Sequence, residues 1–273
     1  MTDRTAVVSV AALPDPRRWA RARLALLRPW LFPAVLLGLY EAYARRAAAL
    51  GSEALAPPSA AMKALLGAAA DGSLWQATGF TLGTAALGLL LGAVLGVGLG
   101  IALGLSHRAA QLSLLSIEVL RPVPSVALIP LAMLMFGFGM RMELCIVAFA
   151  TFWPMLILVE SAVRQVEPRL LEVSRVLGLS ARERAWKIVL PAIVPRLFVA
   201  LRLGVAVALV VAVTVEIAAN PNGMGYAMMI AQQSFEPALM LGWLGWIGVV
   251  GFVINAAMLR LQRAVARRMG AGE

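Results

Sequence analysis

Long apolar runs separated by short polar intervals make up most of this chain. Five of the runs cover Trp30 to Leu50, Ala77 to Leu105, Met142 to Glu160, Leu197 to Glu216 and Met240 to Leu261. A sixth apolar stretch, over residues 117–140, is interrupted by Pro122, Pro124 and Pro130. Because a helix needs about 20 mainly apolar residues to cross a bilayer, the pattern predicts an all-α polytopic membrane protein with six transmembrane helices. The prolines predict that the third span is kinked or broken.

The first run is the least regular of the six, because Glu41, Arg45 and Arg46 lie in its second half. The letters A-Y-A at 42–44 also resemble a signal-peptide cleavage site. The run lies far from the start of the chain for a signal peptide, and an uncleaved helix gives an even number of spans. We therefore expect a first span preceded by a basic cytoplasmic tail over 1–28. Paired prolines introduce a short external helix near Ser59–Ala70.

The distribution of charge predicts the orientation of these spans. Charged residues are 14% of the chain, whereas a soluble domain carries about 25%. If both termini lie in the cytoplasm, 19 of the 24 Lys and Arg residues lie on that side, which is the asymmetry expected of an N-in/C-in protein. The net charge of +10 is then explained by topology, and no nucleic-acid partner is expected. The single cysteine, Cys145, allows neither an internal disulfide nor a cysteine-ligated metal site.

The longest polar interval between spans runs from Pro168 to Pro195. Gly178 fits the left-handed position that ends a helix, and Ser180 with Glu183 forms a capping-box pattern that starts another helix. The second helix carries Trp186 and meets Pro191. The local sequence predicts two short helices joined by a tight turn outside the bilayer. An ordinary solvated hairpin between two spans is the alternative interpretation.

The spacing within this hairpin resembles the EAA loop of permease subunits of binding-protein-dependent ABC importers. The pattern is Glu172-Val173-Ser174, three residues, Gly178, nine residues, then Ile188-x-Leu190-Pro191. It departs from the family at Val173 and Ser174, where alanines are common. The resemblance implies a type I (MetI-like) permease architecture, with one permease domain over 29–273 and a cytoplasmic coupling loop over 161–195. The implied coupling residues are Glu172, Val173, Ser174, Leu177, Gly178, Leu179, Ser180, Ile188, Leu190 and Pro191.

Other segments resemble the nitrate, sulfonate and taurine branch of that family: L-R-P-V-P at 120–124 and V-E-I-A-A at 215–219 followed by G-M-G-Y. The resemblance implies a multi-pass subunit of the cell inner membrane in contact with lipid, paired with a second permease copy, an ATP-binding subunit and an extracytoplasmic solute-binding protein. The implied solute is a sulfonate, taurine, nitrate or a similar anion. ATP and magnesium would bind to the partner ATPase, so this chain is expected to carry no cofactor.

No phosphate-binding loop of the form G-x-x-x-x-G-K-[ST] occurs in the sequence, and no motif of a hydrolase or zinc peptidase occurs either. We therefore expect no catalytic residue, no metal site and no enzymatic activity in this chain. An ATP-independent secondary transporter is the main alternative function. A membrane anchor or assembly factor without a transport pathway is a third possibility, which the proline-rich and glycine-rich spans weakly oppose.

Two sets of residues inside the spans are candidates for packing and for transport. Small residues let helix backbones approach closely in lipid, so five glycines at every fourth position predict a helix–helix contact: Gly88, Gly92, Gly96, Gly100 and Gly104. Polar or bulky groups that are candidates for the pathway, although each also has a packing interpretation, are Ser125, Met135, Phe136, Thr151, Thr214 and Glu216. Glu118 and Arg121 lie three residues apart and could pair on one helical face, where a structural ion pair is favoured over a gate.

Overall fold

The structure is a computed structural model that describes residues 16–50 and 55–268. Within these residues the regular secondary structure is helical throughout, as the apolar runs predict. The first 15 residues of the expected N-terminal tail lie outside the described residues. The chain divides into two compact units, 1–59 and 60–273, and each is described by itself.

The first unit contains one long helix, α1 (Pro16–Ala49), which includes the first apolar run. Two of the charged residues near the end of this helix, Glu41 and Arg45, are paired. Arg45 Nε donates to Glu41 Oε1 over 2.5 Å, and the backbone N–H and hydroxyl of Ser59 also donate to the Glu41 carboxylate. The paired carboxylate explains how charged residues are tolerated at the end of an apolar helix.

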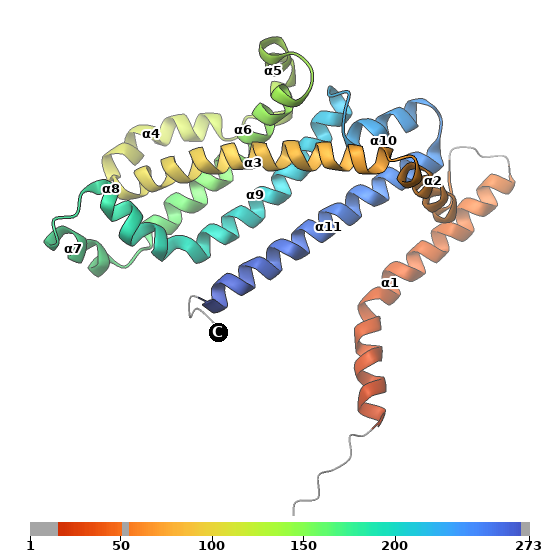
Figure 1. Cartoon of the computed structure of the whole chain (residues 1–273), viewed down its shortest axis with the longest axis horizontal. Coiled ribbons are helices and arrows are strands. Elements are labelled where there is room, and N and C mark those ends of the chain that lie inside the picture. The colour runs from red at the N-terminus through yellow and green to blue at the C-terminus, as the bar shows by residue number, and fades with distance from the viewer. Residues whose placement is uncertain (1–15, 51–54, 269–273) are drawn as a thin grey trace, which may run out of the picture. The chain divides into compact units, whose positions relative to one another are not determined.

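The second unit begins within α2 and carries most of the helices (Figure 1). Their bounds are α2 Pro58–Ala70, α3 Ser73–Leu105, α4 His107–Leu120, η1 Ser125–Leu128, α5 Ile129–Phe136, α6 Met140–Arg164, α7 Pro168–Val176, α8 Ala181–Arg184, η2 Ala185–Val189, α9 Leu190–Ala218, α10 Met224–Gln233 and α11 Pro237–Arg268.

Four helices in the described residues are long and apolar enough to cross a membrane: α3, α6, the continuous helix Ala181–Ala218 and α11. A fifth span is possible if α4 and the η1–α5 segment count together, because they are bent by 81° at the break between them. This break lies at Arg121–Pro124, as the prolines of the third run predict. The helix α1 is not among the candidate spans.

The centre of the second unit is the contact between α3 and α6, which lie side by side along most of their lengths (Figure 1). The five α3 glycines face α6 throughout this contact. A β-carbon added at Gly88, Gly96 or Gly104 would lie 2.5–2.7 Å from a β-carbon of α6. The absence of a side chain on this face of α3 therefore allows the two backbones to approach closely.

The helix after Gly178 differs from the short helix expected from the sequence. It does not end at Pro191 but continues from Ala181 to Ala218, so the second hairpin helix and the fifth span are one element. The five residues before Leu190 form a π-helical turn, η2, in which the Leu190 N–H bonds to the Ala185 carbonyl. Proline has no N–H to donate to the helix. The wider π-helical turn directly before Pro191 changes the hydrogen-bond pattern at this point, and the helix continues beyond the proline.

Candidate functional site

The polar hairpin between α6 and α9 is built by strong local signals. The helix α7 ends at Val176, and Gly178 has a φ of +66°, which places it in the left-handed region. The Leu179 N–H donates to the Ser174 carbonyl over 3.0 Å, which closes the turn as in a Schellman motif. Ser180 and Glu183 then form a complete capping box at the start of α8. These contacts fix the direction in which the chain leaves α7.

One side of α7 anchors the hairpin to the spans. Ser174 is fully buried and its hydroxyl donates to the Leu171 carbonyl over 2.6 Å. Leu171 packs against an apolar cluster that joins the end of α6 to the start of α9 and includes Val163, Val189 and Ile193. Leu171 thus connects α7 to the residues where α6 ends and α9 begins.

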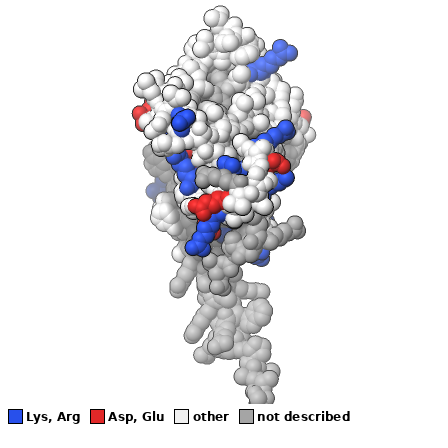
Figure 2. Space-filling model, turned by 90° about the vertical axis from the view of Figure 1, so that its left-hand side faces the viewer, with Lys and Arg blue, Asp and Glu red and all other residues white. Residues whose placement is uncertain are grey.

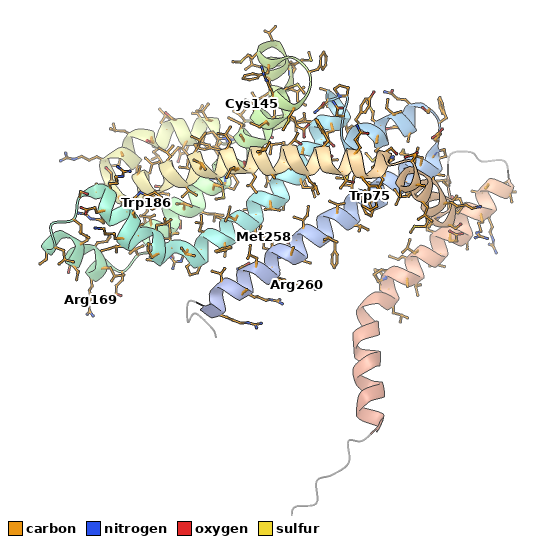
Figure 3. The ribbon with its side chains drawn as sticks, viewed as in Figure 1. Trp75, Cys145, Arg169, Trp186, Met258 and Arg260 are labelled. Carbon is orange, nitrogen blue, oxygen red and sulfur yellow. The ribbon has the colours of Figure 1, made fainter. Side chains whose placement is uncertain are left out.

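Several apolar side chains of the hairpin are exposed. The exposed fractions are 52% for Val173, 88% for Val176, 66% for Leu177 and 65% for Trp186. Trp186 and Arg169 both lie at the hairpin end of the unit, far from Trp75 at the other end of α3 (Figure 3). Viewed from this end, Lys and Arg side chains are scattered over a largely uncharged surface with fewer Asp and Glu (Figure 2). We call the exposed apolar residues at the end of α7, Val173, Val176 and Leu177, the hairpin patch, whereas Trp186 lines a pocket between α3 and α9.

The other coupling candidates lie on the turn or at the base of α9. Glu172, Gly178, Ser180 and Pro191 are exposed, whereas Leu179, Ile188 and Leu190 are half-buried. The fully buried Val189, which the sequence analysis did not single out, is the residue of this segment that packs into the anchoring cluster. Val189 is the last residue of the π-helical turn. No residue pattern predicts that turn, so the burial of Val189 could not be predicted from the sequence.

The candidate pathway residues do not converge on one site. Met135 and Phe136 are exposed at the end of α5. Thr151 is fully buried against Gly92, and its hydroxyl donates to the Val147 carbonyl of its own helix. The Thr214 hydroxyl likewise donates to the Val210 carbonyl. Thr151 is therefore in a packing position, whereas Met135 and Phe136 are exposed.

Glu216 belongs to a buried polar network at the end of α9. Its Oε2 accepts a bond of 2.8 Å from the Gly225 N–H, and Gly223 lies directly against its carboxylate. The Met224 N–H donates to Thr81 of α3 over 2.9 Å. The bond to Glu216 ties the segment that begins α10 to α9, and the bond to Thr81 ties it to α3.

A second buried carboxylate, Glu143 of α6, completes the network and was missed in the sequence. It is fully buried and accepts hydrogen bonds from the Thr84 hydroxyl of α3 and from the Asn220 side-chain amide. A glutamate in the first turn of an apolar run was the available signal. Its partners are 59 and 77 residues away in the sequence, so they could not be identified from spacing.

Ser125 is the only pathway candidate that lines a cavity in the middle of the spans. The cavity has a volume of about 410 Å³ and lies between α6, α9 and the break after α4, with Arg121 also in its wall. The expected ion pair between Glu118 and Arg121 is wrong: the described residues contain no such pair. Arg121 caps the end of α4, and the chain turns away there, so the two side chains are not held on one helical face.

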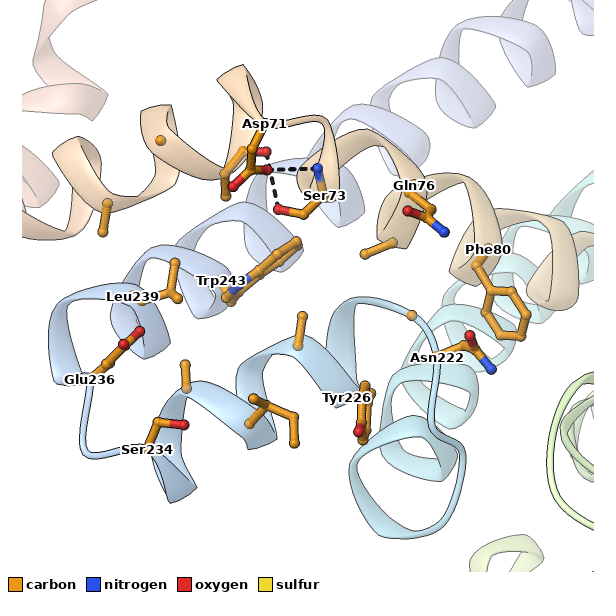
Figure 4. Close-up of a pocket in the computed structure, with 18 of the residues that line it drawn as sticks. Asp71, Ser73, Gln76, Phe80, Asn222, Tyr226, Ser234, Glu236, Leu239 and Trp243 are labelled. Carbon is orange, nitrogen blue, oxygen red and sulfur yellow. Dashed lines mark hydrogen bonds between the residues drawn. The ribbon is translucent and has the colours of Figure 1, made fainter.

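A larger crevice of about 780 Å³ lies at the other end of the unit, between the α2–α3 turn, α10 and the start of α11 (Figure 4). Asp71 and Glu236 are its acidic residues, and Ser73, Gln76 and Tyr226 add polar groups. The Ser73 side chain and backbone N–H bond to Asp71 and hold the pKa of its carboxyl below the usual value. Asp71 therefore stays ionised to a lower pH than an ordinary aspartate does.

Comparisons with known proteins give a uniform result. The family model described as "Binding-protein-dependent transport system inner membrane component" matches residues 88–271. "Putative aliphatic sulfonates transport permease protein SsuC" of Escherichia coli (strain K12) is 29% identical over 235 residues, covering 86% of this chain and 89% of that protein. "Taurine transport system permease protein TauC" of the same organism is 28% identical over 214 residues, covering 77% and 78%.

Among solved structures, inward-facing conformations of the MetNI methionine ABC transporter match this chain with a TM-score of 0.61. The match covers 71% of this chain and 98% of that chain at 19% identity. At this identity the likeness shows a shared fold. It agrees with the MetI-like architecture expected from the hairpin spacing.

Proposed function

Because this chain belongs to the family of binding-protein-dependent transport system inner membrane components, it is a permease subunit of an ABC importer, and we propose that its hairpin patch docks onto a separate ATPase. The observation that carries the proposal is the exposure of Val176 and Leu177 on a polar loop between two candidate spans. Exposed apolar groups gathered on one rigid turn are typical of a protein–protein contact. Since α7 is anchored to α6 and α9, movement of a docked ATPase would reach the spans directly.

In this proposal the coupling segment is 161–195, with Glu172, Gly178 and Ser180 shaping the turn and Leu177 and Leu179 near the contact. ATP and magnesium bind to the partner. The partner's closure on ATP favours one conformation of the spans and its opening favours another, so energy enters as differential binding to two states.

The solute is a small organic anion, for which the names of the relatives are the support: one is named for aliphatic sulfonates and another for taurine. A solute-binding protein delivers the solute from the extracytoplasmic side, and two copies of the permease together form the pathway. The proposed topology has six spans, with α1 as the first span and α4 with η1–α5 as a broken third. Both termini then lie in the cytoplasm.

The test is co-purification of the full chain with an ATP-binding subunit of an ABC importer from the same organism, followed by ATPase assays in lipid with and without a solute-binding protein. Val176→Asp and Leu177→Asp should abolish association while leaving the fold intact, because neither side chain is buried within the chain. Gln165→Asp is the matched control, since it adds the same charge at an exposed position of the same loop. Gly178→Asp should distort the left-handed turn. We therefore expect weaker binding of the ATPase, or a complex in which ATP hydrolysis no longer drives transport.

Two results would contradict the proposal. The first is a folded wild-type permease that does not bind the ATPase. The second is full binding-protein-stimulated ATPase activity in the Leu177→Asp complex. Uptake that depends on an ion gradient or a membrane potential and proceeds without ATP would support the secondary-transporter alternative.

A further inference from the structure

The cavity in the middle of the spans is formed around an interruption of the backbone. Its walls come from residues 149–158 of α6 and 203–211 of α9, which are near the middle of each helix. The third wall is the break between α4 and η1, represented by Arg121, Val123 and Ser125. Non-helical backbone at membrane depth is tolerated where protein buries it or where it lines a water-filled cavity. The cavity therefore accounts for how the interrupted backbone between α4 and η1 is tolerated among the spans.

Arg121 is the only charged residue that lines this cavity. No acidic side chain lines it, and no ion pair involving Arg121 occurs among the residues that the structure describes. An arginine within membrane spans is costly unless it is paired or faces a cavity. Arg121 is exposed at the end of α4, so it brings to the wall of the cavity a positive charge that no acidic side chain of the described residues pairs with.

A second lining residue carries a hydrogen-bond donor without an acceptor. Trp153 is 9% exposed, and its indole Nε1 has no hydrogen-bond partner among the described residues. The indole nitrogen can only donate. The Ser125 hydroxyl is a third polar group on the wall, and the remaining lining side chains are aliphatic, aromatic or proline. The lining residues therefore include one cation and two residues with hydrogen-bond donors in an otherwise apolar wall.

We propose that this cavity is an anion-binding station on the transport pathway, with Arg121 as the residue that determines selectivity for a sulfonate-like oxyanion. The proposal rests on the proposed function, which makes these spans a pathway. A guanidinium presents a planar set of donors that matches the oxygens of such a group, and it repels cations. A single fixed charge also leaves binding weak enough for the anion to move on.

The test measures the potential in the cavity without the partner proteins or the natural solute. Ser125→Cys is made in a Cys145→Ala background, and membranes are treated with a negatively charged sulfonatoethyl or a positively charged trimethylammonioethyl methanethiosulfonate. Reaction rates are normalised to those of a free thiol. Arg121→Gln should lower the ratio of anionic to cationic labelling by about fivefold or more, as Coulomb interaction with one nearby charge in a wet site implies. Arg121→Lys should keep most of the preference.

Arg141→Gln is the matched control, because Arg141 is an exposed arginine of α6 that does not line the cavity. Butanesulfonate should slow the labelling, and Trp153→Phe, which removes the N–H and keeps an aromatic ring, should weaken that protection. An unchanged ratio in Arg121→Gln, no protection by butanesulfonate, or no reaction with either reagent would overturn the proposal. Since the ATPase is absent, failure of the docking experiment does not affect this result. An unchanged ratio alongside an intact ATPase complex would overturn the anion station alone.

Discussion

A methyl group added to the glycine face of α3 tests whether the contact with α6 holds the spans together. The perturbation is Gly96→Ala. Its new β-carbon would lie 2.7 Å from the Met155 β-carbon and 2.8 Å from the Phe152 carbonyl oxygen. Neither atom can rotate away, because one is backbone and the other is bonded to it. One of the two helices must therefore shift.

Gly98→Ala is the control on the same helix, because its β-carbon would meet no atom within 4 Å. Both variants gain the same helix propensity, which is up to about 1 kcal/mol for alanine over glycine. The difference between them isolates the crowding. Overpacking of a well-packed contact costs about 1–3 kcal/mol, so Gly96→Ala should be less stable than Gly98→Ala by that amount.

The assay is equilibrium unfolding of the purified chain in mixed micelles or bicelles, with both variants measured under the same conditions. Met155→Ala should not rescue Gly96→Ala, because alanine keeps the β-carbon that makes the contact. Equal stability of Gly96→Ala and Gly98→Ala would refute the reasoning, and so would a complete rescue by Met155→Ala.

Three further predictions concern the buried network and the crevice. Asn220→Leu should lower the stability by about 1–3 kcal/mol in the same unfolding assay, because it leaves the buried Glu143 carboxylate with Thr84 as its remaining partner. Gly223→Ala should lower the melting temperature more than Gly72→Ala: both have a positive φ, but only Gly223 lies against the Glu216 carboxylate, so equal shifts would contradict crowding. Since the lowered pKa of Asp71 means that folding favours its ionised form, its contribution should be complete above the ordinary pKa of 3.8 and lost as the pH falls below it. The stability advantage of the wild type over Asp71→Asn in a pH series should therefore disappear at the acid end, and an advantage that grows there would contradict this sign.

Sequence reasoning succeeded where structure is decided by neighbours along the chain. The left-handed Gly178, the capping box at Ser180 and the short helix at Pro58–Ala70 each follow from a few adjacent residues, and the structure has all of them. The regular spacing of the α3 glycines also identifies one helical face without knowledge of the partner helix. Local signals of this kind do not depend on how the spans are arranged.

The features that the sequence analysis missed or predicted wrongly depend on the three-dimensional arrangement and not on adjacent residues. Glu143 is important because Thr84 and Asn220 meet it across the fold, and nothing in its own segment indicates those partners. Arg121 was assigned to Glu118 by helical spacing, but the helix ends between the two side chains and the pairing is lost. The continuous helix through Pro191 depends on a π-helical turn, whose wider hydrogen bonding is not encoded by a distinct residue pattern.

The glycine contact also limits how the permease can change conformation. Sliding α3 along α6 by one residue is a translation of about 1.5 Å, which would carry the β-carbons of Val147, Met155 and Val163 away from the glycines that accommodate them. Contacts of 2.5–2.7 Å to an added carbon leave no space for such a step at three separate turns. The two helices should therefore move as one body. If the proposed ATPase contact moves α7, that movement should act at the start of α9, where the π-helical turn and Pro195 interrupt the regular helical hydrogen bonds. A cross-link between α3 and α6 should accordingly leave ATP-driven transport intact, and inhibition by it would show that this contact slides.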